Sequence, residues 1–432
     1  MPGRIRLFAM FATLAVAFAT MPVSNAATAT YNNAVLGVRL EHPAAAAVLE
    51  DQHIADTFGF TLVDEALGPA HTPLLLRVAQ AQGTASPEQK ARELRAQFAD
   101  LPLQQQSVSF GRVQGIAVSG VPGEYSANTY IYAGANGRVF EIIYGRETLD
   151  QRGMALLNGL RFTAPRATLA SLRLPAANDT ARVAPPAAIQ QQADQEDAQR
   201  AQAAAQAQSN GVVPQANTLA PTRDAQAPDA GTLGEVSPQN DYLFGAPGCV
   251  DWPSWKAAQV PWDRYAWGSG WSKAGPSWYG EGGHINCNSP GALNDYHAID
   301  FPMYEWNSLY APAAGRVIYA GWATGGWASA GRVVILDLGN GYWSGSFHLR
   351  SIAVSAGQYV NTTTRIGYVG GSGYGRDGYF GNHLHQGLYL NARLYASNGG
   401  VYGGQSVEPH YWRRTSDGGM YTDIGRWAWM RY

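Results

Sequence analysis

The sequence predicts two folded regions: a small N-terminal α+β domain and a C-terminal, mainly antiparallel β domain, joined by a disordered linker. All 13 Trp residues lie at or after Trp252. No Phe, Trp or Tyr occurs between Phe162 and Tyr242. On both sides of this gap, short apolar runs alternate with turn-forming residues, which is typical of β structure. The predicted segments are a signal peptide at 1–26, the α+β domain at 27–166, the linker at 167–240 and the β domain at 241–432.

The first 26 residues have the order of a secretory signal peptide. Arg4 and Arg6 precede an apolar run over residues 7–19, and Ser24-Asn25-Ala26 supplies a small-x-small cleavage site. A membrane anchor is the alternative, but a spanning helix needs about 20 apolar residues and this run is shorter. We therefore expect an exported protein, secreted or periplasmic, with no membrane span in its mature form.

The N-terminal domain is predicted from short apolar strands and two helices. Ser86 is a suitable N-cap for a helix over 86–98, with Pro87 in its first turn. A second helix is expected over 149–160. The predicted strands lie at 34–38, 61–63, 74–78, 116–118, 130–132 and 138–144. This domain contains no recognisable catalytic constellation, so we expect it to be a pro-domain or an accessory domain.

The linker at 167–240 is rich in Ala, Gln, Pro, Asp and Thr. A segment without aromatic residues buries too little apolar surface to offset the entropy of ordering it. We therefore expect disorder, with at most a transient helix over Gln190–Gln208.

The C-terminal domain is rich in Gly and aromatic residues and shows little helical periodicity. The Asn340-Gly341 pair between two apolar runs predicts a β-hairpin. The predicted strands lie at 315–322, 332–338, 342–349, 365–369 and 384–390.

Charge excludes one class of partner. The net charge is −2, and neither half of the chain has the basic excess that binding to a phosphate backbone requires. We therefore expect no nucleic-acid partner. Charged residues make up 14% of the chain, against about 25% in typical domains, which excludes a charge-driven disordered protein for most of its length.

The two cysteines, Cys249 and Cys287, both lie in the C-terminal half. In an exported chain such a pair predicts a disulfide. The alternative is a cysteine peptidase in which Cys287 is the nucleophile and His348 activates it. Nothing near Cys287 in the sequence would lower the pKa of its thiol, as that chemistry requires.

The histidines indicate a metal site. On a strand, His383 and His385 would lie on the same face because side chains two residues apart point the same way. His348 ends the hairpin strand, and Asp300 follows an apolar residue in a short extended segment. Zn²⁺ binds His nitrogen and Asp oxygen, and catalytic zinc keeps one position open. One His-x-His pair is weak evidence, since exposed strands carry it by chance.

Two other motifs can be excluded. His-Glu-x-x-His occurs nowhere in the chain, so the corresponding class of zinc peptidase is absent. Residues 373–378 match Gly-x-Gly-x-x-Gly, but this loop leads into a predicted strand rather than a helix, so we reject it as a nucleotide site.

The C-terminal half resembles the lysostaphin-type and beta-lytic metalloendopeptidases, which are zinc enzymes that cut peptide bonds in bacterial peptidoglycan. The resemblance covers about residues 260–390 and consists of seven pieces in the family's order. They are Gly282-Gly283-His284, Ala298-Ile299-Asp300-Phe301, the run 311–317, Phe347-His348-Leu349, Val354-x-x-Gly357-Gln358-x-Val360, Ile366-Gly367 and Gly381-Asn382-His383-Leu384-His385. It implies a lysostaphin-like fold, a β-sheet core crossed by a groove.

The resemblance also implies the site residues. His284, Asp300 and His385 would be the ligands of one Zn²⁺, and His348 and His383 the unligated catalytic histidines. Many members place the first ligand four residues before the Asp, where this chain has Tyr296, with His297 three residues before it. An offset of three on a strand points side chains to opposite faces. We therefore favour His284, as in the beta-lytic branch, and keep His297 as the alternative.

The implied function is an exported zinc metalloendopeptidase that cuts cross-bridges or stem peptides of peptidoglycan. The beta-lytic branch prefers Gly-Gly bonds. We expect a monomer whose residues 27–240 form a removable pro-region, with a retained accessory domain as the alternative. A metal-free, peptidoglycan-binding regulator of the same fold is the alternative for the C-terminal domain. The sequence does not identify the substrate-binding residues.

Overall fold

The computed structural model describes residues 27–50, 59–64, 74–81, 86–123, 127–165, 181–209, 278–279, 298–406, 412–413 and 420–421. The predicted signal peptide, Cys249, Cys287, His284 and His297 lie outside these residues. Among the helices within them, none combines the length and the apolar character that crossing a bilayer requires.

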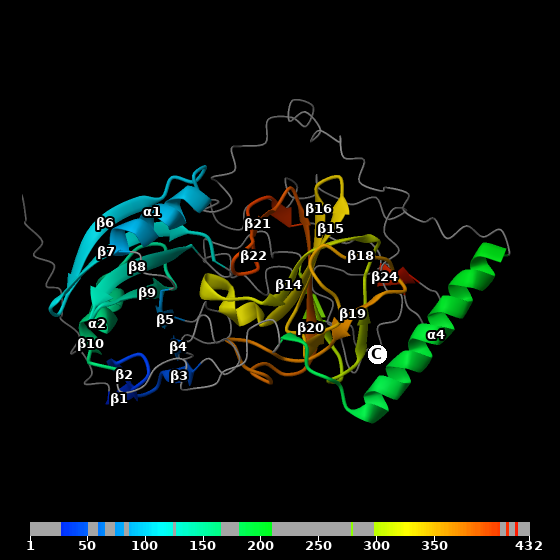
Figure 1. Cartoon of the computed structure of the whole chain (residues 1–432), viewed down its shortest axis with the longest axis horizontal. Helices are drawn as coiled ribbons and strands as arrows, with labels where there is room; N and C mark the ends of the chain where they lie inside the picture. Colours follow the sequence, from blue (N-terminus) through cyan, green and yellow to red (C-terminus); the bar gives the residue numbers. More distant parts are fainter. Residues whose placement is uncertain are drawn as a thin grey trace, which may run out of the picture.

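The N-terminal domain is built on a seven-stranded antiparallel sheet (Figure 1). In spatial order its strands are β3 (Ala47–Glu50), β4 (Gly59–Asp64), β5 (Leu74–Gln80), β9 (Arg138–Tyr144), β8 (Asn128–Ala135), β7 (Val113–Val121) and β6 (Gln104–Phe110). A second sheet has the order β1 (Thr28–Asn33), β2 (Val38–Pro43) and β10 (Leu160–Phe162). The helices of this domain are α1 (Pro87–Gln97) and α2 (Gln151–Gly159).

Local sequence explains both helices. The Ser86 hydroxyl accepts a hydrogen bond from Gln89 N at 3.3 Å, so it caps α1 as predicted. The Asp150 carboxylate accepts from Gly153 N at 2.8 Å and caps α2. Burial of this carboxyl opposes ionisation, yet its pKa is lowered because Gly153 N and the Tyr144 hydroxyl donate to it. The predicted α+β character is confirmed.

One predicted strand is wrong. Residues 34–37 form a turn between β1 and β2 rather than part of a strand. Asn33 closes this turn, because its side-chain oxygen accepts from Leu36 N at 2.9 Å. Gly37 has φ of +67°, and a Cβ there would lie 2.4 Å from the Thr163 carbonyl oxygen, so only glycine fits. The apolar residues of the turn thus reflect burial of Leu36 in the core rather than an extended backbone, and the strand begins only at Val38.

The seven-stranded sheet buries both of its faces. Along β8, Ile131 and Ala133 belong to one apolar core, which β2, β10 and α2 complete. Tyr130 and Tyr132 point to the opposite face, into a second core that contains α1. Alternation along one strand therefore supplies two separate cores.

The predicted linker differs from expectation over residues 181–209. Helix α4 spans Ala187–Ser209, where the sequence predicted at most a transient helix. Its Ala- and Gln-rich composition has high helix propensity. Gln190 and Gln192 donate hydrogen bonds to Asp194 and Glu196 one turn later, at 2.6 and 3.0 Å. The lack of aromatic residues in this segment argues against a packed core of its own, but it does not prevent a helix.

The C-terminal domain is mainly antiparallel β, as predicted. Its large sheet has the order β11 (Trp278–Tyr279), β12 (Ile299–Pro302), β20 (His383–Leu390), β16 (Tyr342–Phe347), β15 (Arg332–Gly339), β14 (Gly315–Trp322) and β18 (Tyr359–Val360). Strand β23 (Gln405–Ser406) pairs with β20 as well. A small sheet has the order β13 (Ser308–Tyr310), β19 (Arg365–Tyr368) and β17 (Ser351–Ile352). The remaining elements are the hairpins β21 (Arg393–Tyr395) with β22 (Gly400–Tyr402) and β24 (Trp412–Arg413) with β25 (Met420–Tyr421), and the 3-10 helix η7 (Gly325–Ala330).

The predicted hairpin between β15 and β16 is confirmed. Asn340 and Gly341 have φ of +52° and +78°, as a type I′ turn requires. This turn sets the register of β15 with β16, in which Val334 lies opposite Ser346 near the end of β16.

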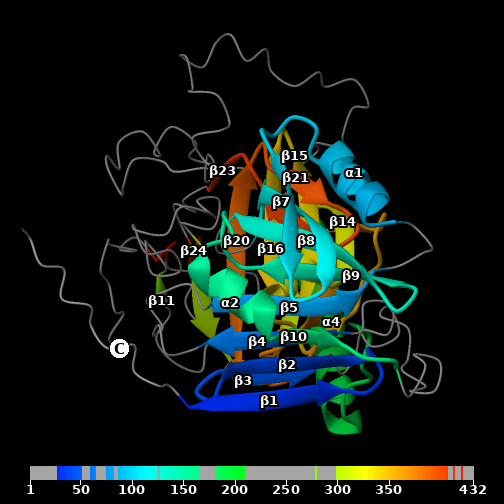
Figure 2. The same ribbon diagram turned by 90° about the vertical axis from the view of Figure 1, so that its left-hand side faces the viewer.

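The large sheet of the C-terminal domain is covered on both faces. One face packs on the small sheet in an apolar core that includes Leu336, Leu384 and Leu388. The other face carries Val333, Phe347 and Tyr389, and these share a core with α1, β7 and β8 of the N-terminal domain. Figure 2 shows β7 and β8 in front of β16 and β20. The two domains are therefore joined by a continuous apolar core.

Candidate active site

Three histidines gather where β16 ends and β20 begins. The ring centroids of His348 and His383 are 4.8 Å apart, and those of His348 and His385 are 5.6 Å apart. His348 and His385 are buried, whereas His383 is half-buried. The structure therefore brings together three of the five predicted site residues, although their sequence positions span 38 residues from His348 to His385.

Strand geometry explains the orientation of His383 and His385. The intervening Leu384 is fully buried in the core against the small sheet. The two histidines thus lie on the other face, as predicted from the period of two residues. Phe347, the register partner of His385, is in ring contact with it at 5.2 Å.

Asp300 lies on the neighbouring strand. In the antiparallel pairing of β12 with β20, Asp300 is the register partner of His385. Register partners belong to the same face of a sheet. The backbone therefore places a carboxylate-bearing residue directly beside the histidine pair. The fifth predicted residue, His284, and its alternative, His297, lie outside the described residues, so the choice between them stays a prediction.

His348 adopts an unusual backbone conformation, with φ of +60°. Non-glycine residues in this region carry strain of about 1–3 kcal/mol. Hydrogen bonds on both sides hold this conformation: His348 N donates to Ala330 O at 3.0 Å, and Ser372 N donates to His348 O at 3.2 Å. The left-handed residue turns the chain out of β16 and directs the imidazole toward β20.

Hydrogen bonds select the tautomers of two imidazoles. His348 Nδ1 lies 2.9 Å from the Ser372 carbonyl oxygen, and His383 Nδ1 lies 2.6 Å from the Gly381 carbonyl oxygen. A carbonyl oxygen can only accept, so each Nδ1 must carry the proton. In the neutral rings, the basic lone pair is therefore on Nε2. This is the form that a proton-accepting imidazole needs.

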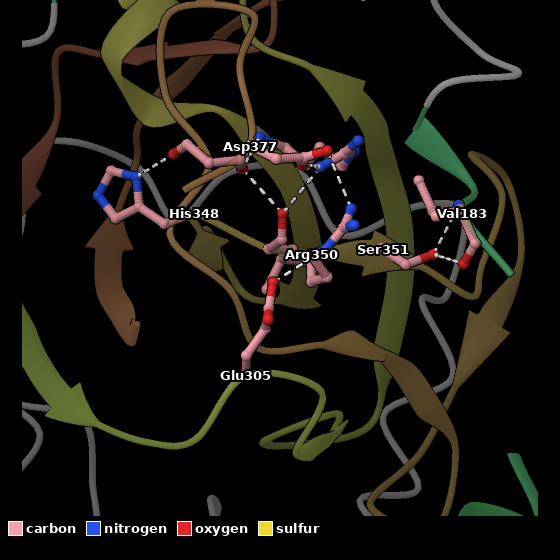
Figure 3. Close-up of polar contacts among 9 residues, drawn as sticks. Val183, Glu305, His348, Arg350, Ser351 and Asp377 are labelled. Carbon is pink, nitrogen blue, oxygen red and sulfur yellow. Dashed lines mark hydrogen bonds and ion pairs between the residues drawn. The ribbon is translucent and has the colours of Figure 1, made fainter. Parts of the chain in front are cut away.

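No sequence motif predicted a charged network that is connected to His348 through the loop of residues 370–382. Asp377 accepts hydrogen bonds from Arg332 and, at 3.0 Å, from Arg350 (Figure 3). Arg350 also pairs with Glu305 at 3.0 Å. The Arg332 side chain is 0% exposed, and its burial lowers the pKa of the guanidinium while Asp377 opposes that shift. The signal in the sequence was Arg332, which directly precedes the apolar run of residues 333–336 in β15.

The loop that carries Asp377 is the one with the Gly-x-Gly-x-x-Gly pattern. It folds back at Gly373 and Arg376, whose backbone groups exchange two hydrogen bonds of 2.9 Å. It then runs into strand β20 rather than a helix, which agrees with its rejection as a nucleotide site. Phe380 from this loop lies 4.5 Å from the His348 ring, measured between centroids.

The donor types at this position suit Zn²⁺, which binds imidazole nitrogen and carboxylate oxygen. His385 and its register partner Asp300 supply one of each. In the part of the chain that the structure describes, no three His, Cys, Asp or Glu residues form a complete metal-binding group. The predicted third ligand, His284, lies outside that part.

Comparisons with known proteins agree on the C-terminal half. Residues 294–397 match the profile of Peptidase family M23. The chain is similar to the catalytic domain of the antimicrobial peptidase lysostaphin from Staphylococcus simulans, at 24% identity over 32% of this chain and 90% of that chain, with a TM-score of 0.21.

Two further solved structures show similarity. One is a putative peptidase M23 from Pseudomonas aeruginosa, at 29% identity over 32% of this chain and 52% of that chain, with a TM-score of 0.21. The other is a putative glycyl-glycine endopeptidase LytM from Ruminococcus gnavus, at 25% identity over 30% of this chain and 51% of that chain, with a TM-score of 0.23. The aligned region spans about half of each of these two proteins. No curated protein matches the chain.

Proposed function

We propose that this chain is an exported zinc metalloendopeptidase that hydrolyses peptide bonds in bacterial peptidoglycan, because residues 294–397 match the profile of Peptidase family M23. The observation that carries this proposal is the cluster of His348, His383 and His385 inside the matched region, with Asp300 beside His385 in the register of the sheet. These are the residue types that metal-assisted peptide hydrolysis needs.

Asp300, His385 and His284 would hold the zinc ion. When bound, zinc would polarise the scissile carbonyl and lower the pKa of water toward about 7. The buried setting of His385, against the Phe347 ring, restricts the movement of its imidazole. Restricted side chains bind a metal with less loss of rotamer entropy.

His348 and His383 would move protons. Their Nδ1 protons are engaged by carbonyl oxygens, so each neutral ring offers Nε2 as a base. One imidazole would accept the proton of the attacking water, and a protonated imidazole would donate to the leaving amine. Both tasks need groups within reach of one scissile bond, and the two rings lie 4.8 Å apart.

The substrate class is peptidoglycan peptide, in cross-bridges or stems, with Gly-Gly bonds as the first candidates. The proposal is tested with purified cell walls of defined cross-bridge composition. We expect the release of new amino groups, its loss on addition of a chelator and its recovery with Zn²⁺. Thiol alkylation should have no effect.

Two outcomes would contradict the proposal. Hydrolysis that resists chelation but is lost on alkylation would favour the cysteine peptidase. Binding to cell walls without hydrolysis, by the processed as well as the full-length chain, would favour a non-catalytic regulator.

The N-terminal domain is the basis of a second part of the proposal, namely that the chain is made as a zymogen. Tyr389 and Phe347 lie on the same sheet face as His383 and His385, and both belong to the core shared with the N-terminal domain. Phe98 stacks edge-on against Tyr395 and Tyr402, with centroids 4.9 and 5.1 Å apart. A domain packed on this face would restrict access of a polymeric substrate to the histidines.

A further inference from the structure

The loop of residues 370–382 connects the charged network to the histidine cluster. Asp377 near its middle pairs with Arg332 and Arg350, and both of these arginines lie outside the loop. Ser372 near its start is bonded to His348 through both of its backbone groups: its N–H donates to His348 O, and its carbonyl oxygen accepts from His348 Nδ1. One loop thus carries both the ionic anchor and the acceptor for the imidazole.

The Ser372 side chain strengthens this connection. Its hydroxyl accepts from Arg332 N at 2.9 Å and donates to Leu349 O at 2.8 Å. Ser372 is almost completely buried. The residue is therefore held by the two chain segments that flank the site, the start of β15 and the residue after His348.

The two catalytic candidates differ in how their acceptors are supplied. His383 bonds to Gly381, two residues away, so local chain geometry provides its acceptor. His348 bonds to Ser372, 24 residues away, so its acceptor depends on where the loop is held. An aromatic ring also packs against each arginine. The guanidinium carbon of Arg332 lies 4.2 Å from the ring centroid of Trp322. The guanidinium carbon of Arg350 lies 4.8 Å from the ring centroid of Trp306.

We propose that Ser372 and Asp377 are positioning residues for His348. The ion pairs of Asp377 with Arg332 and Arg350 hold the loop, and the Ser372 carbonyl then fixes His348 as the Nδ1–H tautomer, which leaves the basic lone pair on Nε2. The consequence for catalysis rests on the function proposed above, whereas the tautomer itself does not.

The tautomer can be measured on the full chain with ¹⁵N-labelled histidine, using long-range ¹H–¹⁵N correlation spectra above pH 7. The signal of His348 is identified by its absence from the His348→Gln spectrum. We expect the Nδ1–H pattern in the wild type and a mixture with the Nε2–H tautomer in Asp377→Ala. Glu305→Gln is the matched control, because Glu305 pairs with Arg350 from outside the loop, and it should keep the wild-type pattern.

Activity gives the second readout. In the active secreted species, Asp377→Ala should lower kcat by about 10- to 100-fold, with KM within about twofold and zinc content unchanged. Glu305→Gln should leave kcat within about twofold. Asp377→Ala leaves Arg332 as a buried cation with fewer partners, so the double variant Arg332→Met with Asp377→Ala removes both charges and should fold. Its kcat should stay low, because the loop is still released.

An Nε2–H pattern for His348 in the wild type would overturn the proposal. So would the same His348 pattern in the wild type and in the folded Asp377 variants. If the wild type hydrolyses no peptidoglycan, the proposed function is wrong. The spectra still test the positioning of His348, because they do not depend on activity.

Discussion

His348 combines three features that together distinguish it from a structural histidine. It is buried, its backbone is left-handed, and its Nδ1 is bonded to a residue 24 positions away. Backbone strain of this kind is retained where the surroundings over-determine it. Here the surroundings are Ala330 and Ser372, which bond both backbone groups of His348. The strained backbone conformation, held by these hydrogen bonds, gives the imidazole one orientation.

The five predicted site residues would divide into zinc ligands and proton-transferring histidines, and single substitutions can separate these two proposed roles. We expect His385→Ala to lose zinc and activity together, because it removes a ligand. His348→Ala should keep zinc and lose activity by about 10²- to 10⁴-fold, the usual contribution of a general acid or base. Metal analysis and hydrolysis rates of the two purified variants check this.

Loss of zinc from the His348 variant would contradict this division of roles. His42→Ala is a suitable control, since His42 lies on β2 of the N-terminal domain, far along the chain from the site. It should change neither zinc content nor rate.

At the scale of elements, α4 is attached to the C-terminal domain by polar contacts. Asp197 pairs with Arg365 at 3.1 Å and accepts from the Tyr310 hydroxyl at 2.8 Å. Just before the helix, the Ser351 hydroxyl bonds both backbone groups of Val183. Figure 1 shows α4 on the opposite side of the C-terminal domain from the N-terminal domain.

These contacts predict that Asp197→Ala weakens the attachment of α4, while the Val183–Ser351 bonds and the Asp194–Arg365 contact at 3.7 Å remain. The pair is partly exposed, with side-chain exposures of 13% for Arg365 and 38% for Asp197, so the loss of stability should be about 1 kcal/mol or less. Amide exchange within Ala187–Ser209 should nevertheless accelerate, because helices in proteins owe most of their stability to tertiary contacts rather than to propensity. Hydrogen-exchange mass spectrometry measures it.

Glu196→Ala is the matched control for this test. It removes the same charge from the next position, and its recorded side-chain hydrogen bond is to Gln192 within the helix. Equal exchange rates in the two variants would mean that α4 is not held through Asp197.

At the scale of the whole molecule, the apolar core shared by the two domains covers part of the sheet face that carries His383 and His385. Phe98 contributes two ring contacts to this core, each worth about 1 kcal/mol. In Phe98→Leu, domain docking should weaken by about 2 kcal/mol, and the population with an open histidine face should rise by about 30-fold. We therefore expect faster hydrolysis by the full-length chain, measured before any proteolytic processing.

Phe110→Leu provides the comparison, because Phe110 is buried in the other core of the N-terminal domain. It should lower the melting temperature of that domain without raising the rate. Equal rates for wild type and Phe98→Leu would contradict inhibition by domain docking.

Features that depend on local sequence were predicted well. Strands β9 and β14 have the predicted bounds, and the Ser86 cap and the Asn340-Gly341 turn form as expected. The common face of His383 and His385 follows from the two-residue period of a strand. In each case, neighbours within a few residues determine the outcome.

Other features were decided by tertiary structure, because they depend on residues far apart in the chain. In the run at 34–38, the close approach of the Thr163 carbonyl oxygen leaves room only for glycine at position 37. Helix α4 is held by Arg365 and Tyr310. No local sequence pattern predicts these long-range contacts.

The sequence by itself predicted the residue types of the candidate site and the common face of His383 and His385, because strand periodicity is a local property. Only the tertiary structure decided which nitrogen of His348 carries its proton, because its acceptor comes with a loop that two distant arginines hold. Likewise, only the tertiary structure decided that the N-terminal domain packs on the sheet face that carries the histidines. Apolar burial is non-directional, so a strand that is buried on both faces does not specify what will cover it.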